Sequence, residues 1–179
     1  MVLGVDKLLE LVKEKQLVER LCEREQTNPE GCGFDLCLGK AHKLSGRAFM
    51  GLTERDTANA DLIGEYCEEK IAFLLLKPGE SYLVTTKEKI NLPDNITANM
   101  SLRGTLYRSG IIMSGGNSAP GYSGELSFLL HNAGPVEVKI EYGARIVHIM
   151  FFEVSGQTNL YRGQWKGGRV ATEGREIQV

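Results

Sequence analysis

The second half of the chain consists of short apolar runs separated by turn residues, and this alternation limits the possible folds more than any other feature. The runs are Ile71 to Leu76, Ser81 to Thr86, Leu126 to Leu130, Val136 to Ile140 and Arg145 to Val154. Turn signals such as Lys77-Pro78-Gly79 and Ala119-Pro120-Gly121 stand between them. Strands of this length and spacing are typical of a β-sandwich, a jelly roll or a barrel.

The amino-terminal segment follows a different period. Apolar residues between Val5 and Leu21 roughly occupy one face of an amphipathic helix, with an interruption near Gln16. We therefore expect an N-terminal helix within residues 1–22. The polar stretch from Gly46 to Lys70 has little period and is predicted to be a long loop or an irregular insertion.

At 179 residues, the chain is expected to form a single domain over residues 1–179 with a core of its own. No composition shift marks an internal domain boundary. The tail, residues 163–179, is rich in glycine and basic at its start, so it is predicted to be mobile without a ligand.

The composition argues against several kinds of partner. The formal net charge is −2, so no overall positive field attracts nucleic acid or a membrane surface. A polyanionic ligand would need a local cluster of Arg and Lys. No apolar run is long enough for a transmembrane helix or a signal peptide, so we expect a cytoplasmic protein. The four cysteines form no CxxC pair and are predicted to be free thiols.

The stretch after residue 101 carries the strongest chemical signal. Arg103, Gly104, Thr105 and Arg108 lie within six residues of one another. Guanidinium groups, a hydroxyl and a close glycine backbone are what a triphosphate requires. The alternative is a basic turn at the end of a strand.

A turn-rich segment follows. Gly115-Gly116-Asn117 is succeeded by Pro120-Gly121-Tyr122-Ser123-Gly124-Glu125. Such a bend lets main-chain amides contact the edge of a base while one aromatic ring packs on a sugar.

These two stretches resemble motifs of the dUTPase and dCTP deaminase superfamily. Its members typically carry R-S-S-L-x-R-x-G and later I-D-P-G-[YFW]-x-G-E; this chain has R-G-T-L-Y-R-S-G from Arg103 and S-A-P-G-Y-S-G-E from Ser118. Three further stretches agree in order: G-F-D-L-C-L-G from Gly33, G-A-R-I from Gly143 and Y-R-G-Q-W-K-G-G-R from Tyr161. The resemblance implies a mainly β, jelly-roll-like distorted barrel that forms a homotrimer with shared active sites.

The resemblance also assigns a phosphate side to the site. The residues implied there are Arg103, Gly104, Thr105, Arg108, His148, Lys166 and Arg169. Mg²⁺ would arrive with the triphosphate and be held mainly by its oxygens, with no direct protein ligand. Asp35 would at most contact the water around the ion.

A base side is implied as well. Gly116, Asn117 and Ser118 would recognise the pyrimidine of dUTP or dCTP through main-chain groups, and Tyr122 would pack on the deoxyribose. Trp165 would either stack on the base or cover the end of the barrel.

Four positions depart from the superfamily pattern. Ala119 stands where the family has the Asp that activates water, and losing such a base typically costs ~10²–10⁴-fold in rate. Leu129 occupies the position of the glutamate that deaminases use to move protons. Gly104 removes a hydroxyl, and His148 replaces a glutamine.

Three functions therefore compete. The first is a dUTP diphosphatase that yields dUMP and pyrophosphate, with Arg108 facing the phosphates and Glu125 or Asp35 as the remaining carboxylates. The alternative for Glu125 is a solvent-exposed charge on a strand, without a catalytic role. The second function is a non-catalytic nucleotide binder or regulator. The third is a dCTP deaminase, which Leu129 disfavours; Ala119 could also be a substitution made to trap a substrate.

Overall fold

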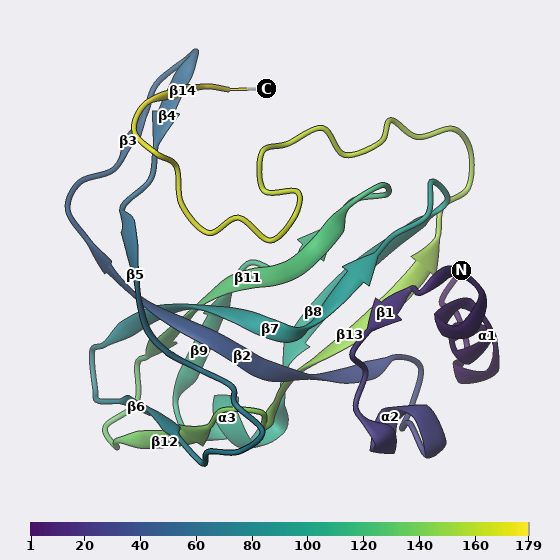
Figure 1. The fold of residues 1–179 in the computed structure, drawn as a ribbon, viewed down its shortest axis with the longest axis horizontal. Coiled ribbons are helices and arrows are strands. Elements are labelled where there is room, and N and C mark those ends of the chain that lie inside the picture. The colour runs from purple at the N-terminus through teal and green to yellow at the C-terminus, as the bar shows by residue number, and fades with distance from the viewer. Residues whose placement is uncertain (179) are drawn as a thin grey trace.

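The structure, a computed structural model, describes residues 1–178, and a nine-stranded antiparallel sheet forms their central body (Figure 1). Its main path runs through β10 (Asn117–Ser118), β8 (Ile96–Leu102), β13 (Arg145–Glu153), β2 (Phe34–Ser45), β7 (Ser81–Asn91), β11 (Ser123–Asn132) and β9 (Ile111–Ser114). Off this path, β1 (Val18–Glu19) pairs with β7 and β5 (Asn59–Glu65) pairs with β2.

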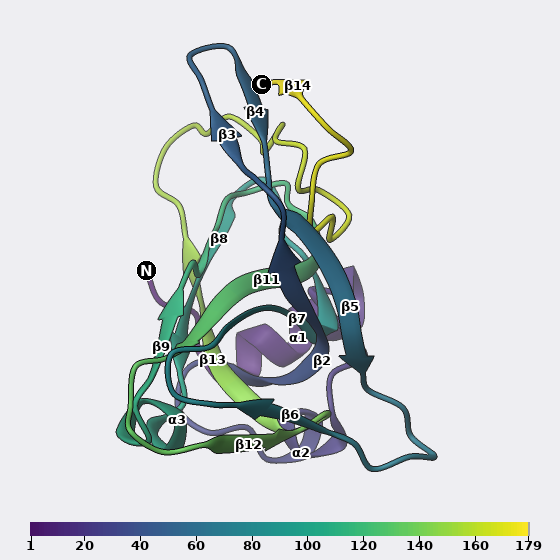
Figure 2. The ribbon, with the colours of Figure 1, turned by 90° about the vertical axis from the view of Figure 1, so that its left-hand side faces the viewer.

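The sheet curls around its own core (Figure 2). Along β11 every second residue is buried, including Leu126, Phe128 and Leu130, as expected for a strand with one face inward. Phe34 and Phe151 pack edge to face with their ring centroids 6.3 Å apart. The predicted mainly β, jelly-roll-like distorted barrel is confirmed.

The N-terminal helix is also confirmed, but it is shorter than residues 1–22. Helix α1 (Val5–Lys15) ends where Gln16 adopts a left-handed φ of 52°. The chain then extends, so that Val18 pairs with Ile90 of β7. The later apolar residues are therefore buried by an extended segment rather than by a further helical turn. A second short helix, α2 (Glu23–Thr27), follows.

The prediction of a long loop over residues 46–70 is wrong. This region contains β3 (Phe49–Met50), β4 (Glu54–Asp56) and β5, and Figure 2 shows the β3–β4 hairpin projecting from the body. Most of β5 is exposed or half-buried on both faces. Without a buried face there is no apolar alternation to find in the sequence.

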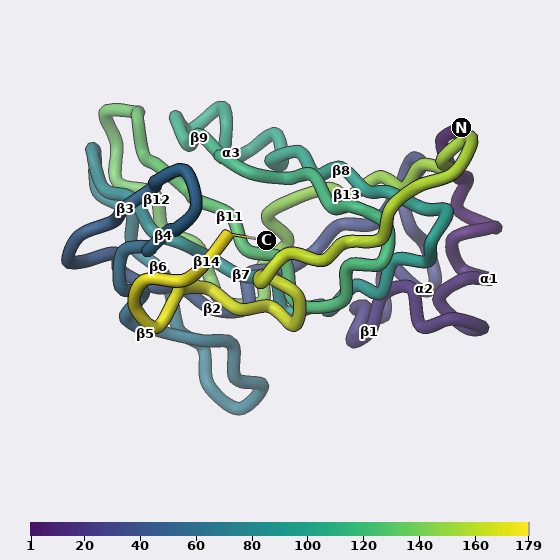
Figure 3. The backbone as a smooth tube through the Cα atoms, turned by 90° about the horizontal axis from the view of Figure 1, so that it is seen from above, coloured from purple at the N-terminus to yellow at the C-terminus, as the bar shows by residue number. Residues whose placement is uncertain are grey.

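The tail returns over the sheet. In Figure 3 it crosses the molecule toward the projecting hairpin, where β14 (Glu176–Ile177) pairs with β4. A separate two-stranded sheet joins β6 (Phe73–Leu76) to β12 (Val138–Glu141), and α3 (Gly104–Arg108) follows β8. The four cysteines are free thiols. No helix in residues 1–178 is long and apolar enough to cross a membrane.

Candidate functional site

The phosphate-like motif begins where β8 ends. Arg103 is extended and precedes the single turn of α3. A Cβ at position 104 would lie 2.7 Å from Nη1 of Arg108, so a serine there would displace that guanidinium. With glycine, Arg108 lies over the ring of Tyr107, its guanidinium carbon 5.0 Å from the ring centroid. Thr105 and Arg108 are both exposed and can meet a ligand.

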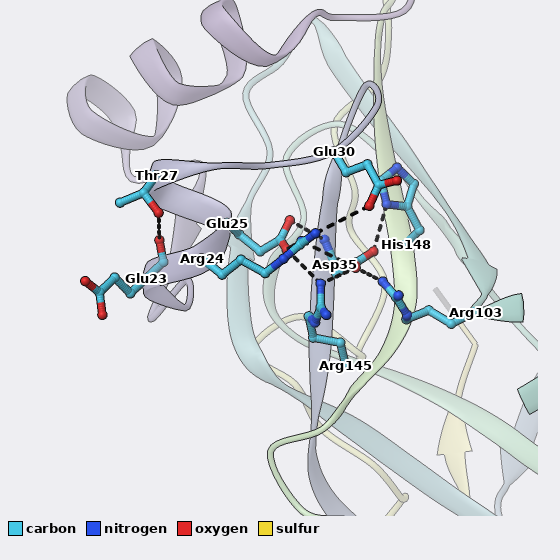
Figure 4. Close-up of polar contacts among 9 residues, drawn as sticks. All are labelled: Glu23, Arg24, Glu25, Thr27, Glu30, Asp35, Arg103, Arg145 and His148. Atoms are coloured by element: carbon cyan, nitrogen blue, oxygen red, sulfur yellow. Dashed lines mark hydrogen bonds and ion pairs between the residues drawn. The ribbon is translucent and has the colours of Figure 1, made fainter. Parts of the chain in front are cut away.

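Asp35 is the centre of a charged cluster beside this motif (Figure 4). Its side chain is buried, and Oδ2 accepts hydrogen bonds or ion pairs from Arg103 and, at 3.0 Å, from Nη1 of Arg145. The other oxygen, Oδ1, lies 3.0 Å from Nδ1 of His148. Asp35 and His148 are direct partners in the register of β2 and β13, which explains the contact.

Helix α2 adds a second buried carboxylate. Glu25 is 1% exposed, and its Oε2 accepts a hydrogen bond of 3.0 Å from the main-chain N–H of Asp35. Its Oε1 pairs with Arg24 and lies 3.4 Å from Nη1 of Arg145. Two buried carboxylates thus hold three guanidinium groups in place, as buried charges require.

Cation crowding shapes the electrostatics of this cluster. Burial, followed by the positive charges of Arg145 and Arg24, holds the pKa of Arg103 below its ordinary value. Burial also lowers the pKa of His148, and Arg103 adds to that effect against the opposing charge of Glu25. Burial is the largest cause of both pKa shifts, and at Arg103 the two neighbouring arginines add a repulsion that a bound anion would offset.

A cleft of about 460 Å³ lies against the same residues. Its polar lining consists of Arg103, Thr105, Lys139, Glu141 and Arg145. Three cationic side chains outnumber the single carboxylate of Glu141, so the cleft keeps an excess of positive charge, which suits a phosphate chain.

A second, smaller cleft of about 150 Å³ lies at the base-like motif. It is lined by Asn117, Ser118, Ala119, Tyr122, Leu126, Ser127, Tyr161 and Trp165. Two main-chain carbonyls of the bend at residues 116–118 already accept hydrogen bonds from strand β8. The carbonyl of Gly116 accepts from the N–H of Met100 at 2.9 Å, and that of Ser118 accepts from Thr97 Oγ1 at 2.7 Å.

Tyr122 forms one wall of this base cleft. It is buried, donates a hydrogen bond of 2.6 Å to the carbonyl of Glu125 and meets the ring of Tyr161 edge to face at 5.3 Å. Burial raises its pKa to about 12. The ring is therefore a rigid neutral surface, as a sugar platform requires.

The base cleft offers no side chain for acid–base chemistry. Within the described chain, its lining contains no Asp, Glu or His. Ala119 contributes only a methyl group, and Leu129 lies on the same face of β11 as Ser127, two residues further along. Neither position can exchange a proton.

Glu125 lies in a different cleft from Ala119, together with Tyr66 and Lys87. Its carboxylate pairs with Arg20 at 2.9 Å and Lys40 at 3.0 Å. Burial raises its pKa, but the hydrogen bonds from Arg20 and Lys40 outweigh burial and the net pKa is lowered. Glu125 is thus a paired charge, rather than the solvated one that its sequence context suggested.

The tail lies against the base side in the same chain. The main-chain N–H of Gly167 donates to the carbonyl of Ser123 at 2.6 Å, and Trp165 reaches the base cleft. Lys166 is exposed, whereas Arg169 pairs with Glu176, one contact being 3.0 Å. The predicted role of residues 163–179 in closing over phosphates stays a prediction, and residue 179 lies outside the described residues.

One chain does not bring the two sides together. Ser118 pairs with Ala98 near the start of β8, whereas Arg103 follows its end. Five residues of strand separate them, roughly 17 Å at about 3.3 Å per residue. The structure therefore unites Arg103, Asp35 and His148 but leaves the base cleft apart.

Sequence patterns missed part of the cluster. Arg145 stands in the G-A-R-I stretch, so the motif could have identified it. Arg24, Glu25 and Glu30 belong to a polar segment without a motif, and only the packing of α2 reveals them.

A curled β-barrel with a cationic cleft and a separate turn-lined cleft defines a class of protein: the dUTPase and dCTP deaminase superfamily. Within that class the chain belongs to the dCTP deaminase-like family, whose model matches residues 2–154.

Individual proteins of known name are similar to this chain and agree with this family assignment. The dCTP deaminase of Pyrococcus furiosus is 38% identical over 157 residues, which cover 87% of this chain and 88% of that protein. The dUMP-forming dCTP deaminase of Dictyoglomus turgidum is 32% identical over 160 residues, covering 87% and 81%. A solved structure, the 2'-deoxycytidine 5'-triphosphate deaminase from Agrobacterium tumefaciens, superposes with a TM-score of 0.63 at 18% identity. The match covers 84% of this chain and 47% of that one, so the chain spans about half its length, and the likeness concerns the fold alone.

Proposed function

We propose that the protein binds a pyrimidine deoxynucleoside triphosphate and hydrolyses dUTP to dUMP and pyrophosphate. The cationic cleft beside Arg103 supports the phosphate part of this proposal. The name of the Dictyoglomus relative supports the product, because dUMP can arise from dCTP only if pyrophosphate is lost as well as the amino group.

The observation that carries hydrolysis is the pair formed by His148 and Asp35. Because Nδ1 of His148 donates to the carboxylate, its Nε2 keeps a lone pair. Nε2 lies beside Gly33, where a Cβ would come within 2.7 Å of it, so the glycine leaves the space from which Nε2 would take a proton from water. The lowered pKa of His148 favours the neutral imidazole near neutral pH. We assign to His148 the water-activating role that Ala119 cannot perform.

A non-catalytic nucleotide binder is the second candidate. Ala119 and the uncharged lining of the base cleft favour it. Deamination of dCTP is less favoured, since it needs a proton carrier at the base and Leu129 offers an alkyl group. The three functions differ in products, so one assay separates them.

We further propose that the site forms between subunits of a homotrimer. The phosphate side of one copy would meet the base side of another, since one chain holds them at opposite ends of β8. Light scattering should then report three copies of the 19.8 kDa chain; a monomer in the presence of bound nucleotide would contradict this assembly.

Magnesium would be held by the oxygens of the triphosphate. Both oxygens of Asp35 already accept hydrogen bonds, from Arg145 and His148, and residues 1–178 contain no cluster of three potential metal-ligating His, Cys, Asp or Glu side chains. The chain's own contribution would be the guanidinium groups that hold the phosphates.

The first experiment measures dUMP, pyrophosphate and ammonia released from dUTP and dCTP with Mg²⁺. We expect slow hydrolysis of dUTP by the parent chain, its loss in His148→Ala, and a gain of roughly 10²-fold or more in Ala119→Asp. Nucleotide binding without turnover in the parent would instead establish the non-catalytic binder. Ammonia from dCTP would establish the deaminase.

A pH profile tests His148 separately. A protonated imidazole has no lone pair, so hydrolysis should be lost on acidification. Because burial lowers the pKa of His148, this acid limb should lie below the ordinary histidine pKa of about 6.5. Asp35, Glu25, Glu30 and Arg103 are the charged groups around this ring. Residual hydrolysis by His148→Gln should be slow and show no acid limb, because glutamine cannot take a proton; an unchanged limb in that variant would assign it to another group.

A further inference from the structure

Arg24 reaches the charged cluster from α2, outside every motif that points to the nucleotide. Its Nη1 pairs with Glu25 and lies 4.0 Å from Oδ2 of Asp35, while its Nη2 lies 3.4 Å from Oε2 of Glu30. Its side chain is 38% exposed, close to the 34% of Arg103. In Figure 4, Arg24 and Arg103 reach Asp35 from opposite sides, and both approach its Oδ2. Because both side chains are partly exposed, an anion bound at Arg103 can also contact Arg24 while the buried contacts of Arg24 remain.

This cluster has three guanidinium groups but only two buried carboxylates. Arg24, Arg103 and Arg145 bring three positive charges, and the buried carboxylates of Glu25 and Asp35 bring two negative ones. One positive charge thus remains without a buried partner. The lowered pKa of Arg103 reflects the same crowding, after its burial.

Glu30 supplies the missing negative charge, but only loosely. Its side chain is 82% exposed, and its one ion pair is the 3.4 Å contact with Arg24. Asn28, Gly31 and Cys32 around it are exposed as well. By contrast, Glu25 is 1% exposed and is held by the main chain of Asp35. Only Glu30 can leave the cluster without breaking a buried contact.

We propose that Arg24 is an additional phosphate-binding residue and that Glu30 is an internal competitor which the phosphate chain displaces from it. The assignment rests on the proposed function, because it takes Arg103 and His148 to face the triphosphate. A phosphate group carries more charge than one carboxylate and binds the guanidinium fork through two oxygens. It therefore replaces the single long contact that Glu30 makes.

Binding of inorganic pyrophosphate to the full chain, measured by calorimetry, tests this without a base. Arg24→Ala should weaken binding roughly tenfold, because it removes a charge-assisted hydrogen bond. Glu30→Gln should strengthen binding several-fold. The exposed residues Arg47 and Glu68 provide controls of equal charge change, and Arg47→Ala and Glu68→Gln should leave the affinity unchanged.

The coupling of the two residues is the sharper test. If Glu30 acts by occupying Arg24, then Glu30→Gln has no effect in the Arg24→Ala background. An equal gain in both backgrounds would overturn the competition, and parent-like affinity in Arg24→Ala would overturn the binding role. Should Arg24→Ala lower the melting temperature, Arg24→Lys keeps the charge without the fork and should bind with intermediate affinity. A parent chain that binds neither pyrophosphate nor dUTP would instead reject the proposed function.

Discussion

The base side and the phosphate side of the candidate site are built from different kinds of side chain. The base cleft is lined by uncharged side chains around Tyr122 and Ala119 and is approached by the tail. The phosphate side gathers three guanidinium groups around Asp35 and Glu25. Main-chain turns and aromatic packing shape the base cleft. Ion pairs, most of them between residues far apart in the sequence, shape the phosphate side.

The two sides therefore have different roles: the base cleft can recognise a nucleotide, whereas only the phosphate side has groups that can take part in a reaction. The base cleft keeps a rigid aromatic wall but has no group that exchanges protons. The phosphate side keeps both the cations and an imidazole held by a carboxylate. Any reaction catalysed by this chain's own residues should therefore depend on the phosphate side, and the base cleft should affect only which nucleotide binds.

Removing the centre of the cluster should have the largest effect. Asp35→Ala should lower the free energy of unfolding by about 3 kcal/mol, because a buried carboxylate is lost and its cationic partners repel one another. This is the low end of the expected range, since Arg103 and Arg145 are each about one-third exposed. Urea denaturation measures it. Asp61→Ala, at an exposed position bonded to Ser45, is the control and should cost under about 0.5 kcal/mol; equal losses in both would mean that the cluster contributes no stability.

Loss of a phosphate contact should come second. Arg108→Ala and Arg103→Ala should each weaken dUTP binding by roughly 10- to 100-fold, as expected for a charge-assisted hydrogen bond. Arg108 gives the cleaner test, because it is exposed and makes no contact with Asp35 in the described structure. Lys13→Ala on α1 serves as the control. Unchanged affinity in both arginine variants would remove the phosphate side from the site.

The smallest effect is expected on the base side. Tyr122→Phe deletes one hydrogen bond to the carbonyl of Glu125 and should lower the free energy of unfolding by about 1 kcal/mol. The ring stays, so the preference for dUTP over UTP should stay as well. A lost preference, measured by competition binding, would show that the hydroxyl contacts the sugar and that this side is more polar than its lining suggests.

The sequence by itself determined several of the strands and the positions of the two motifs. Alternation and turn residues act over a few positions, so the runs at Ile71 to Leu76 and Arg145 to Val154 could be recognised as strands without knowledge of their partners. The resemblance located Ala119 and Leu129, and with them the missing chemical groups. The β3–β4 hairpin escaped prediction because it has no buried face to create a pattern.

Only the tertiary structure decided which charges meet. Asp35 contacts Arg145 and His148 across separations of 110 and 113 residues, and no local pattern encodes such partners. Glu125 lies near Ala119 in sequence but faces another cleft, because the turn at Pro120-Gly121 separates Ala119 from β11, and the partners of Glu125 are Arg20 and Lys40. Strand propensity is local, whereas a buried ion pair exists only once the sheet has set its register.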